Sequence, residues 1–235
     1  MVNMQFLDRE NEILKTIKGM TDAKLDFVVV GGYAVSALAR HRFSIDCDIA
    51  VPKNKLKDFE NFLEKEGFKK HIEKAGFDEI YAGKFVSYKK EAGELPVTID
   101  ILAGSLVCRA TQATWSFEYI KRHSTEASIS STKTSVTSRV PEKELLIAFK
   151  IHSARRADVR DVIMLRENAD QQKILNHLRK GKVEALKEQI KKMIAALDDR
   201  NLVNSLKGVF TLSVDVNKQI ETARKDIKTI LKKLT

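Results

Sequence analysis

The sequence contains few cysteines and prolines and no long apolar segment. Two cysteines in 235 residues, Cys47 and Cys108, supply neither a disulfide framework nor a zinc pattern, and the five histidines lack ligand-like spacing. Three prolines and a hydrophobic content of 43% argue against a disordered chain. No run of 18 uncharged apolar residues occurs, and the acidic, amphipathic start is unlike a signal or transit peptide. We therefore expect a soluble cytoplasmic protein with no membrane partner.

The net charge of +10 is unevenly distributed. Residues 1–140 carry 21 Lys and Arg against 19 Asp and Glu, a net charge of +2, whereas residues 141–235 carry 21 against 13, a net charge of +8. A basic C-terminal half suits a polyanion such as RNA, DNA or nucleotide phosphates. A lysine-rich, solvated surface on long helices fits the same numbers.

Residues 1–140 have the alternating pattern of an α+β domain. The apolar run 26–30 stops at Gly31 and Gly32, which favours a buried strand ending in a glycine turn. We expect a hairpin over 77–90 with its turn at Ala82 and Gly83. The other expected elements are helices over 6–20, 33–40 and 53–66, and strands over 45–51, 96–102 and 132–140.

Residues 141–235 are helical in pattern throughout. Pro141 suits the first turn of a helix, and breaks are expected at 198–201 and around Gly208. The expected helices cover 142–154, 158–168, 171–179, 183–198 and 213–234. The chain is therefore expected to consist of an α+β domain over 1–140 and an all-α helical domain over 141–235. The role of 170–235 stays open among an acceptor-binding module, a dimerisation element and a helical cap.

Three aspartates lie in apolar strand patterns. Asp46 and Asp48 are two residues apart, so both side chains leave the same face of a strand. Asp100 lies between Ile99 and Ile101, where an unpaired carboxylate is costly. Like charges on one face repel, and a divalent cation removes the conflict. Each piece alone has an ordinary explanation, but together with a glycine turn that admits a phosphate they favour nucleotide chemistry.

The order of these motifs resembles the polymerase-β-type nucleotidyltransferase superfamily. The resemblance is carried by FVVVGGYAV at 27–35, RFSIDCDI at 42–49 and VTIDI at 97–101. The Arg-x-Ser-x-Asp-x-Asp form is similar to minimal nucleotidyltransferases and to the AbiEii-like toxins of abortive-infection systems. Lys150, the Ala154-Arg155 pair and the Asp158/Asp161 pair resemble helical motifs of the AbiEii-like branch, although Ala157 stands where that branch has Lys or Arg. The resemblance covers about residues 25–166.

The resemblance implies a mixed sheet with flanking helices, followed by a helical domain. It also implies transfer of a nucleoside monophosphate (NMP) from a nucleoside triphosphate (NTP), with release of pyrophosphate. Asp46, Asp48 and Asp100 would be catalytic and would hold two Mg²⁺ ions. The residues that would bind the nucleotide are Gly31, Gly32, Arg42, Ser44, Lys150 and Arg155. Three alternatives stay open: a solvated lysine at 150, an ion pair of Arg155 with Asp158 or Asp161, and Asp158 as a helix N-cap.

The acceptor is not fixed by these residues. The basic C-terminal half favours RNA, such as tRNA ends. A protein acceptor comes second, and an aminoglycoside-like small molecule third, since a cationic drug would prefer an acidic cleft. The AbiEii resemblance alone implies a toxin with an antitoxin partner. The alternative of another class is a non-enzymatic nucleotide- or RNA-binding protein, against which retention of three costly aspartates counts; a P-loop protein is disfavoured because no GxxxxGK[ST] occurs.

Overall fold

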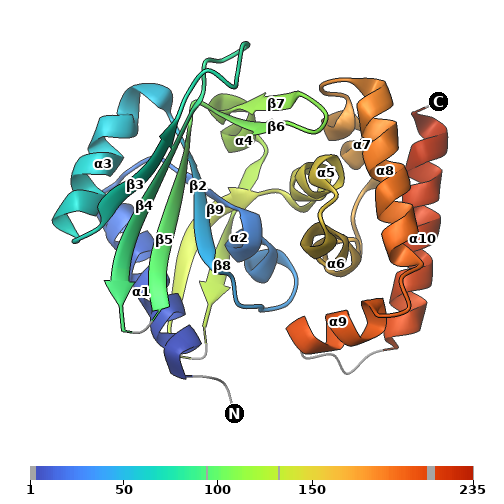
Figure 1. The fold of residues 1–235 in the computed structure, drawn as a ribbon, viewed down its shortest axis with the longest axis horizontal. Helices are drawn as coiled ribbons and strands as arrows, with labels where there is room; N and C mark the ends of the chain where they lie inside the picture. The colour runs from blue at the N-terminus through green and yellow to red at the C-terminus, as the bar shows by residue number, and fades with distance from the viewer. Residues whose placement is uncertain (1–3, 94, 132, 211–214, 235) are drawn as a thin grey trace. The chain divides into compact units, whose positions relative to one another are not determined.

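The computed structural model describes residues 4–93, 95–131, 133–210 and 215–234, and the chain divides into two compact units (Figure 1). Unit 1 comprises Met1–Leu106 and Trp115–Glu142, and unit 2 comprises Val107–Thr114 and Lys143–Thr235. The division passes through one hairpin, so that its base belongs to unit 1 and its tip to unit 2. Each unit is described by itself below.

Unit 1 is built on a five-stranded mixed sheet in the order β1-β2-β5-β4-β3. β2 and β5 are parallel, and the other neighbouring strands are antiparallel. The sheet strands are β1 (Val28–Val30), β2 (Asp46–Val51), β3 (Lys69–Lys74), β4 (Lys84–Ala92) and β5 (Leu95–Ala103). Its helices are α1 (Met4–Asp22), α2 (Gly31–Leu38), the 3₁₀ turn η1 (Lys53–Lys55), α3 (Leu56–Lys65) and α4 (Phe117–Arg122). Two hairpins follow, β6 (Ser105–Cys108) with β7 (Ala113–Ser116) and β8 (Ser124–Ser130) with β9 (Ser135–Pro141).

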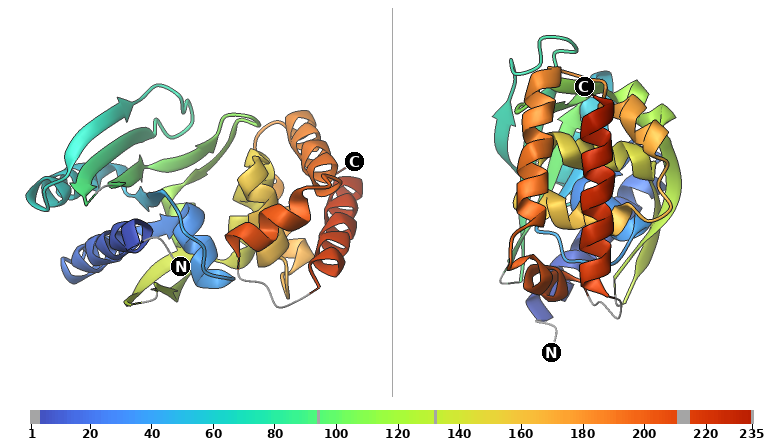
Figure 2. Two further views of the ribbon diagram at one scale, coloured as in Figure 1. Left: turned by 60° about the horizontal axis from the view of Figure 1, so that its bottom comes forward. Right: turned by 90° about the vertical axis from the view of Figure 1, so that its right-hand side faces the viewer.

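The two faces of the sheet differ because side chains alternate along each strand. Cys47 and Ile49 of β2 and Ile99 and Ile101 of β5 are fully buried on one face. Helix α1 packs against β4 and β5, and α3 packs against β3 (Figure 2). Burial of these apolar side chains fixes which residues β2 and β5 present on the opposite face.

The predicted hairpin over 77–90 is wrong in its first arm. Its partner strand is β3, Lys69–Lys74, which pairs with β4 and is rich in lysine, so hydrophobic alternation does not reveal it. The expected arm is instead a turn organised by the Asp78 carboxylate. That carboxylate accepts hydrogen bonds from the backbone N–H groups of Ile80, Tyr81 and Gly83 at 3.1–3.2 Å.

Unit 2 is helical apart from the hairpin tip. Its helices are α5 (Lys143–Ser153), α6 (Arg156–Leu165), α7 (Gln171–Leu178), α8 (Val183–Leu197), α9 (Leu202–Val209) and α10 (Val216–Lys233). Helices α8 and α10 lie side by side (right panel of Figure 2). The sequence prediction finds five of these helices but misses α9, because the segment is short and contains Gly208. The start of the last predicted helix, at 213 and 214, lies outside the described residues.

The sequence prediction also leaves 103–131 without elements, whereas the structure has β6, β7, α4 and β8 there. Strands of four residues such as β6 and β7 carry too little periodicity to recognise. No helix in the described part of the chain has the length and apolar character that a membrane crossing requires.

Candidate active site

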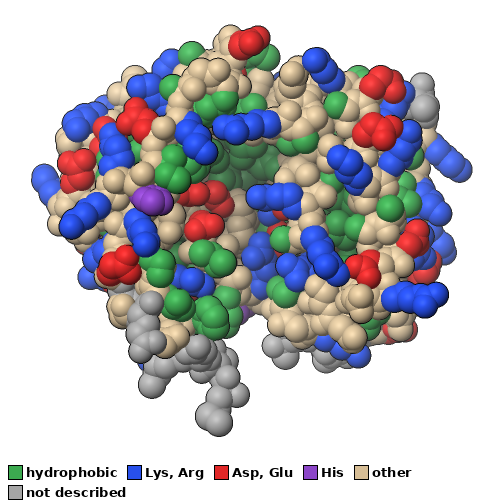
Figure 3. Space-filling view, in the orientation of Figure 1, with side chains coloured by type: hydrophobic (Ala, Val, Ile, Leu, Met, Phe, Trp, Pro, Cys, Tyr) green, Lys and Arg blue, Asp and Glu red, His purple; other side chains and the backbone are tan. Residues whose placement is uncertain are grey.

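The three aspartates lie on one face of two neighbouring strands of unit 1. Asp48 of β2 is the register partner of Asp100 in β5, and Asp46 is the partner of Thr98. Both strands run in the same direction, so the carboxylates of Asp48 and Asp100 leave the sheet side by side. A small group of acidic side chains is visible over β2 in Figure 3. The prediction that one strand face carries this acidic set agrees with the register.

The aspartates are half-buried, although the strands that carry them are largely buried. Burial raises the pKa of Asp46 and that of Asp100, and the charge of Asp46 raises the pKa of Asp100 further. Ser87 of β4 partly offsets this effect, because its hydroxyl donates a 2.6 Å hydrogen bond to Asp100 Oδ1. The folded chain therefore holds these carboxylates under an electrostatic cost that a cation would remove.

The donor set of this face fits a hard divalent cation. Carboxylate oxygens are the ligands that Mg²⁺ prefers, and the one sulfur-containing residue of strands β2 and β5, Cys47, is buried on the other side. Among the described residues, the oxygens of the three aspartates do not all converge within reach of one ion. Binding of one cation by all three aspartates would therefore require side-chain rotations.

Gly31 is the first residue of α2 and packs against Asp48. Its φ of +67° is in the left-handed region that favours glycine, and a Cβ there would overlap Asp48 Oδ2. The predicted glycine turn is thus the first turn of α2 itself. The helix N-terminus, where backbone N–H groups lack intrahelical acceptors, therefore begins directly beside a carboxylate of the acidic face.

Gly32 likewise allows close packing, in this case between α2 and the segment that precedes β2. A Cβ at Gly32 would overlap Ser44 Oγ and lie 3.1 Å from Arg42 Nη2. The four predicted residues Gly31, Gly32, Arg42 and Ser44 are therefore brought together in unit 1, beside Asp48. Ile45, predicted as the first residue of the strand over 45–51, lies just before β2 and is 62% exposed.

The predicted residues Lys150 and Arg155 belong to unit 2, where they form a buried charge cluster. Lys150 is 6% exposed, and its ammonium lies 3.0 Å from Asp158 Oδ1 and 2.8 Å from Asp161 Oδ2. Arg155 Nε contacts Asp158 Oδ2 at 2.9 Å, although the Arg155 side chain is 74% exposed. Burial alone would raise the pKa of Asp158, but Lys150 and Arg155 hold it below its usual value.

This cluster decides the three open alternatives. Lys150 is not a solvated lysine, and Asp158 is the third residue of α6 rather than its N-cap; its carboxylate accepts a hydrogen bond from the Arg155 backbone N–H at 3.0 Å. The ion pair between Arg155 and Asp158 is present. The nucleotide contacts predicted for Lys150 and Arg155 stay predictions.

The site contains one residue that sequence reasoning missed. Ser87 is buried and holds Asp100, but a serine in a strand has no distinctive spacing. The sequence does not reveal that Ser87 lies opposite Asp100, because it does not predict the pairing of β4 with β5.

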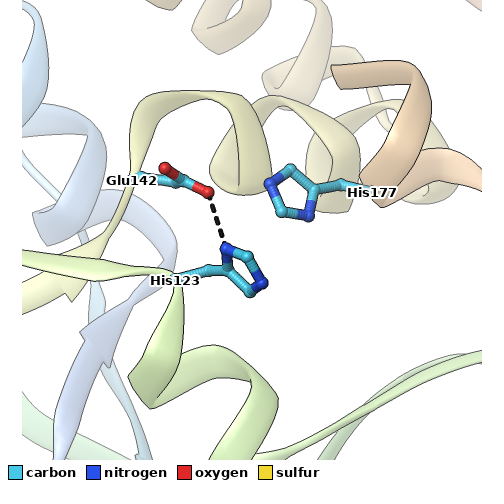
Figure 4. A group of neighbouring side chains, drawn as sticks. All are labelled: His123, Glu142 and His177. Atoms are coloured by element: carbon cyan, nitrogen blue, oxygen red, sulfur yellow. Dashed lines mark hydrogen bonds and ion pairs between the residues drawn. The ribbon is translucent and has the colours of Figure 1, made fainter. Parts of the chain in front are cut away.

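A histidine and a glutamate fasten the end of α4 to the end of β9 within unit 1. His123 Nδ1 lies 3.0 Å from Glu142 Oε1 (Figure 4), and the Glu142 N–H donates to the His123 carbonyl at 2.8 Å. Two contacts between the same residues stabilise the end of the β8–β9 hairpin, and this is the role that the geometry gives His123.

Solved structures share this fold. JHP933 from Helicobacter pylori aligns over 100% of this chain and 95% of its own, with a TM-score of 0.51 and 16% identity. A candidate nucleotidyltransferase from H. pylori aligns over 99% of this chain and 97% of its own, with a TM-score of 0.50 and 17% identity. No protein-family model and no curated protein matches the sequence. The likeness confirms the predicted fold, a nucleotidyltransferase-like mixed sheet with flanking helices and a helical C-terminal region.

Substitution of Gly31 by alanine tests the packing of the site. The new Cβ would overlap Asp48 and strain a left-handed backbone, so Gly31→Ala is expected to lower the free energy of unfolding by about 1–3 kcal/mol. Gly208→Ala is the control, because a Cβ there meets open space in α9 and stabilises the helix by at most about 1 kcal/mol. Urea unfolding measures both; equal stability of Gly31→Ala and the native chain would contradict the geometry.

Substitution of Lys150 tests the charge cluster of unit 2. Lys150→Met removes the ammonium from two buried carboxylates and is expected to cost about 3–5 kcal/mol of stability. Lys191→Met removes an ion pair of similar length, 2.7 Å, to Glu188 on the surface of α8, and thermal unfolding should not change measurably. If both variants unfold at the same temperature, the cluster does not stabilise unit 2.

Proposed function

We propose that this protein is a nucleotidyltransferase, which transfers an NMP from an NTP to an acceptor hydroxyl and releases pyrophosphate. The observation that supports the proposal best is the packing of a glycine helix start against an acidic strand face. Gly31 lies against Asp48, and Asp48 is the register partner of Asp100. A phosphate site and a cation site are thereby adjacent, as transfer of a nucleotidyl group requires.

Each residue of unit 1 has a role that its surroundings support. Asp46, Asp48 and Asp100 would hold two Mg²⁺ ions; Mg²⁺ neutralises phosphate charge and lowers the pKa of an attacking hydroxyl when it is bound. The backbone N–H groups at the start of α2 would bind phosphate oxygens, since they lie at the N-terminal end of a helix that begins beside the acidic face.

The other groups orient the reacting partners. Asp100 would accept the proton of the acceptor hydroxyl, in the orientation set by the hydrogen bond from Ser87. Arg42 and Ser44, beside Gly32, would bind further phosphate oxygens.

The nucleotide contacts of unit 2 form a finer part of the proposal. The exposed guanidinium of Arg155 suits bidentate binding of a phosphate. Lys150 would have to leave Asp158 and Asp161 before contacting a nucleotide. Both roles, and membership of the AbiEii-like branch with its antitoxin partner, rest on the sequence resemblance.

RNA is the acceptor that charge favours. Residues 141–235 carry a net charge of +8, obtained as 21 minus 13, and such a surface attracts a phosphate backbone. A protein or a small-molecule acceptor is the alternative outcome of the experiment that follows.

A labelling experiment tests the activity and the acceptor together. The chain is incubated with each α-labelled NTP, Mg²⁺ or Mn²⁺, and either total tRNA, cellular protein or an aminoglycoside. We expect the label in RNA, together with release of an equal molar amount of unlabelled pyrophosphate. Asp48→Asn should reduce transfer by at least about a thousandfold, because the cation site is lost. Asp22→Asn, in an exposed ion pair with Lys18, should retain native activity.

Three outcomes separate the alternatives. Label in protein or in the small molecule would confirm transfer and overturn the RNA acceptor. If no NTP labels any acceptor with either metal, the enzyme proposal is wrong. RNA binding that weakens steeply with salt and needs no metal would then support the non-enzymatic alternative.

A further inference from the structure

The segment between α2 and β2, residues 39–45, is held from two sides. Ser36 in α2 makes a reciprocal pair with Arg42: the Ser36 hydroxyl donates to the Arg42 carbonyl at 3.1 Å, and the Arg42 N–H donates to Ser36 Oγ at 3.3 Å. This pair fixes the backbone of the segment against α2. The segment carries Arg42 and Ser44, the two side chains that lie beside Gly32.

Helix α1 holds the same segment from the other side. Glu10 Oε1 lies 2.7 Å from His41 Nε2, and the Glu10 carboxylate raises the pKa of His41 through this hydrogen bond. The ring of Phe6 lies 5.8 Å from that of Phe43, and His41 packs edge-on against Phe43 at 5.1 Å. Two residues of α1 therefore contact the segment directly.

Glu10 is an unusual residue for this position. Its side chain is 2% exposed, and its second oxygen, Oε2, has no hydrogen-bond partner among the described residues. Burial of a half-satisfied carboxylate costs stability, and a neutral side chain would pack there at lower cost. Its hydrogen bond with His41 is the feature of this position that bears on the site.

We propose that Glu10 and His41 form a latch that positions Arg42 and Ser44 for binding the nucleotide phosphates. Glu10 and His41 are positioning residues, since neither needs to touch the substrate. The latch holds residues 39–45 in the conformation that places the Arg42 guanidinium and the Ser44 hydroxyl at the start of α2. The phosphate role rests on the proposed function; the conformational role does not.

The same helix supplies a matched control. Glu12 forms an ion pair with Lys90 at 2.7 Å, the same length as the contact between Glu10 and His41. Lys90 is in β4, so the ion pair of Glu12 joins α1 to the sheet and not to residues 39–45. Glu10→Gln and Glu12→Gln therefore make the same chemical change at the same distance from a partner, two residues apart.

Nucleotide affinity tests the phosphate role. With Mg²⁺ and each of the four NTPs, calorimetry should show that Glu10→Gln raises Kd about tenfold, whereas Glu12→Gln changes it less than about twofold. In transfer assays KM should rise with kcat nearly unchanged, because the aspartates are not moved. His41→Gln should raise Kd by a similar factor. The double variant should bind NTP no less tightly than the weaker-binding single variant, since both substitutions disrupt one contact.

Hydrogen exchange of the amides in 39–45 tests the latch without nucleotide. Glu10→Gln should accelerate this exchange and Glu12→Gln should not. Equal exchange in the two variants overturns the latch itself. Faster exchange with unchanged Kd overturns its role in phosphate binding. If the native chain binds no NTP, the proposed function fails, and the exchange result still decides whether the latch exists.

Discussion

Repulsion between carboxylates on one strand face is the constraint around which unit 1 is organised. The parallel pairing of β2 and β5 sets Asp48 opposite Asp100, and burial of Cys47 and Ile99 on the other face fixes this register. A shift of one residue would expose the apolar face and bury the aspartates, so the core enforces an arrangement that is electrostatically unfavourable by itself. Such a conflict is typical of sites at which a ligand supplies the missing charge.

Helix α1 connects the core with the site. Its apolar residues, among them Ile13 and Ile17, are fully buried, while Phe6 and Glu10, nearer its start, contact the segment before β2. The position of Arg42 is thus coupled to the packing of a helix remote from it in sequence. Rigid support of this kind orders the charged groups of a short loop before substrate binds, so that less conformational entropy is lost on binding.

The sequence predicts which residues of unit 1 lie together better than it predicts the topology of the sheet. The two-residue spacing of Asp46 and Asp48 and the glycines after an apolar run are local signals, and the structure places those residues together. Strand β3 was missed because its lysines carry no hydrophobic alternation. The partners of site residues were missed as well: Ser87 and Glu10 act through contacts 13 and 31 residues away in the chain, which no spacing rule reveals.

In unit 2 the sequence reveals a charged motif but not the role of its residues. Lys150, Arg155 and Asp158 are visible in the sequence as a motif, but their pattern does not distinguish ligand binding from internal ion pairing. Burial decides that the ammonium of Lys150 is paired inside unit 2, and burial depends on how α5 and α6 pack. Spacing alone therefore identifies the residue types of a motif but not the partner that satisfies them.

The central claim, that the acidic face is a cation site under electrostatic strain, is tested most directly by thermal unfolding at pH 7 with and without Mg²⁺. The pKa of Asp100 is raised in the folded state, so ionisation of this carboxyl group at pH 7 destabilises the folded protein. Asp100→Asn removes the charge and should therefore melt at a higher temperature than the native chain without metal. Millimolar Mg²⁺ should raise the melting temperature of the native chain and leave that of Asp100→Asn nearly unchanged. A variant that melts below the native chain without metal, or equal responses to Mg²⁺, would contradict the account.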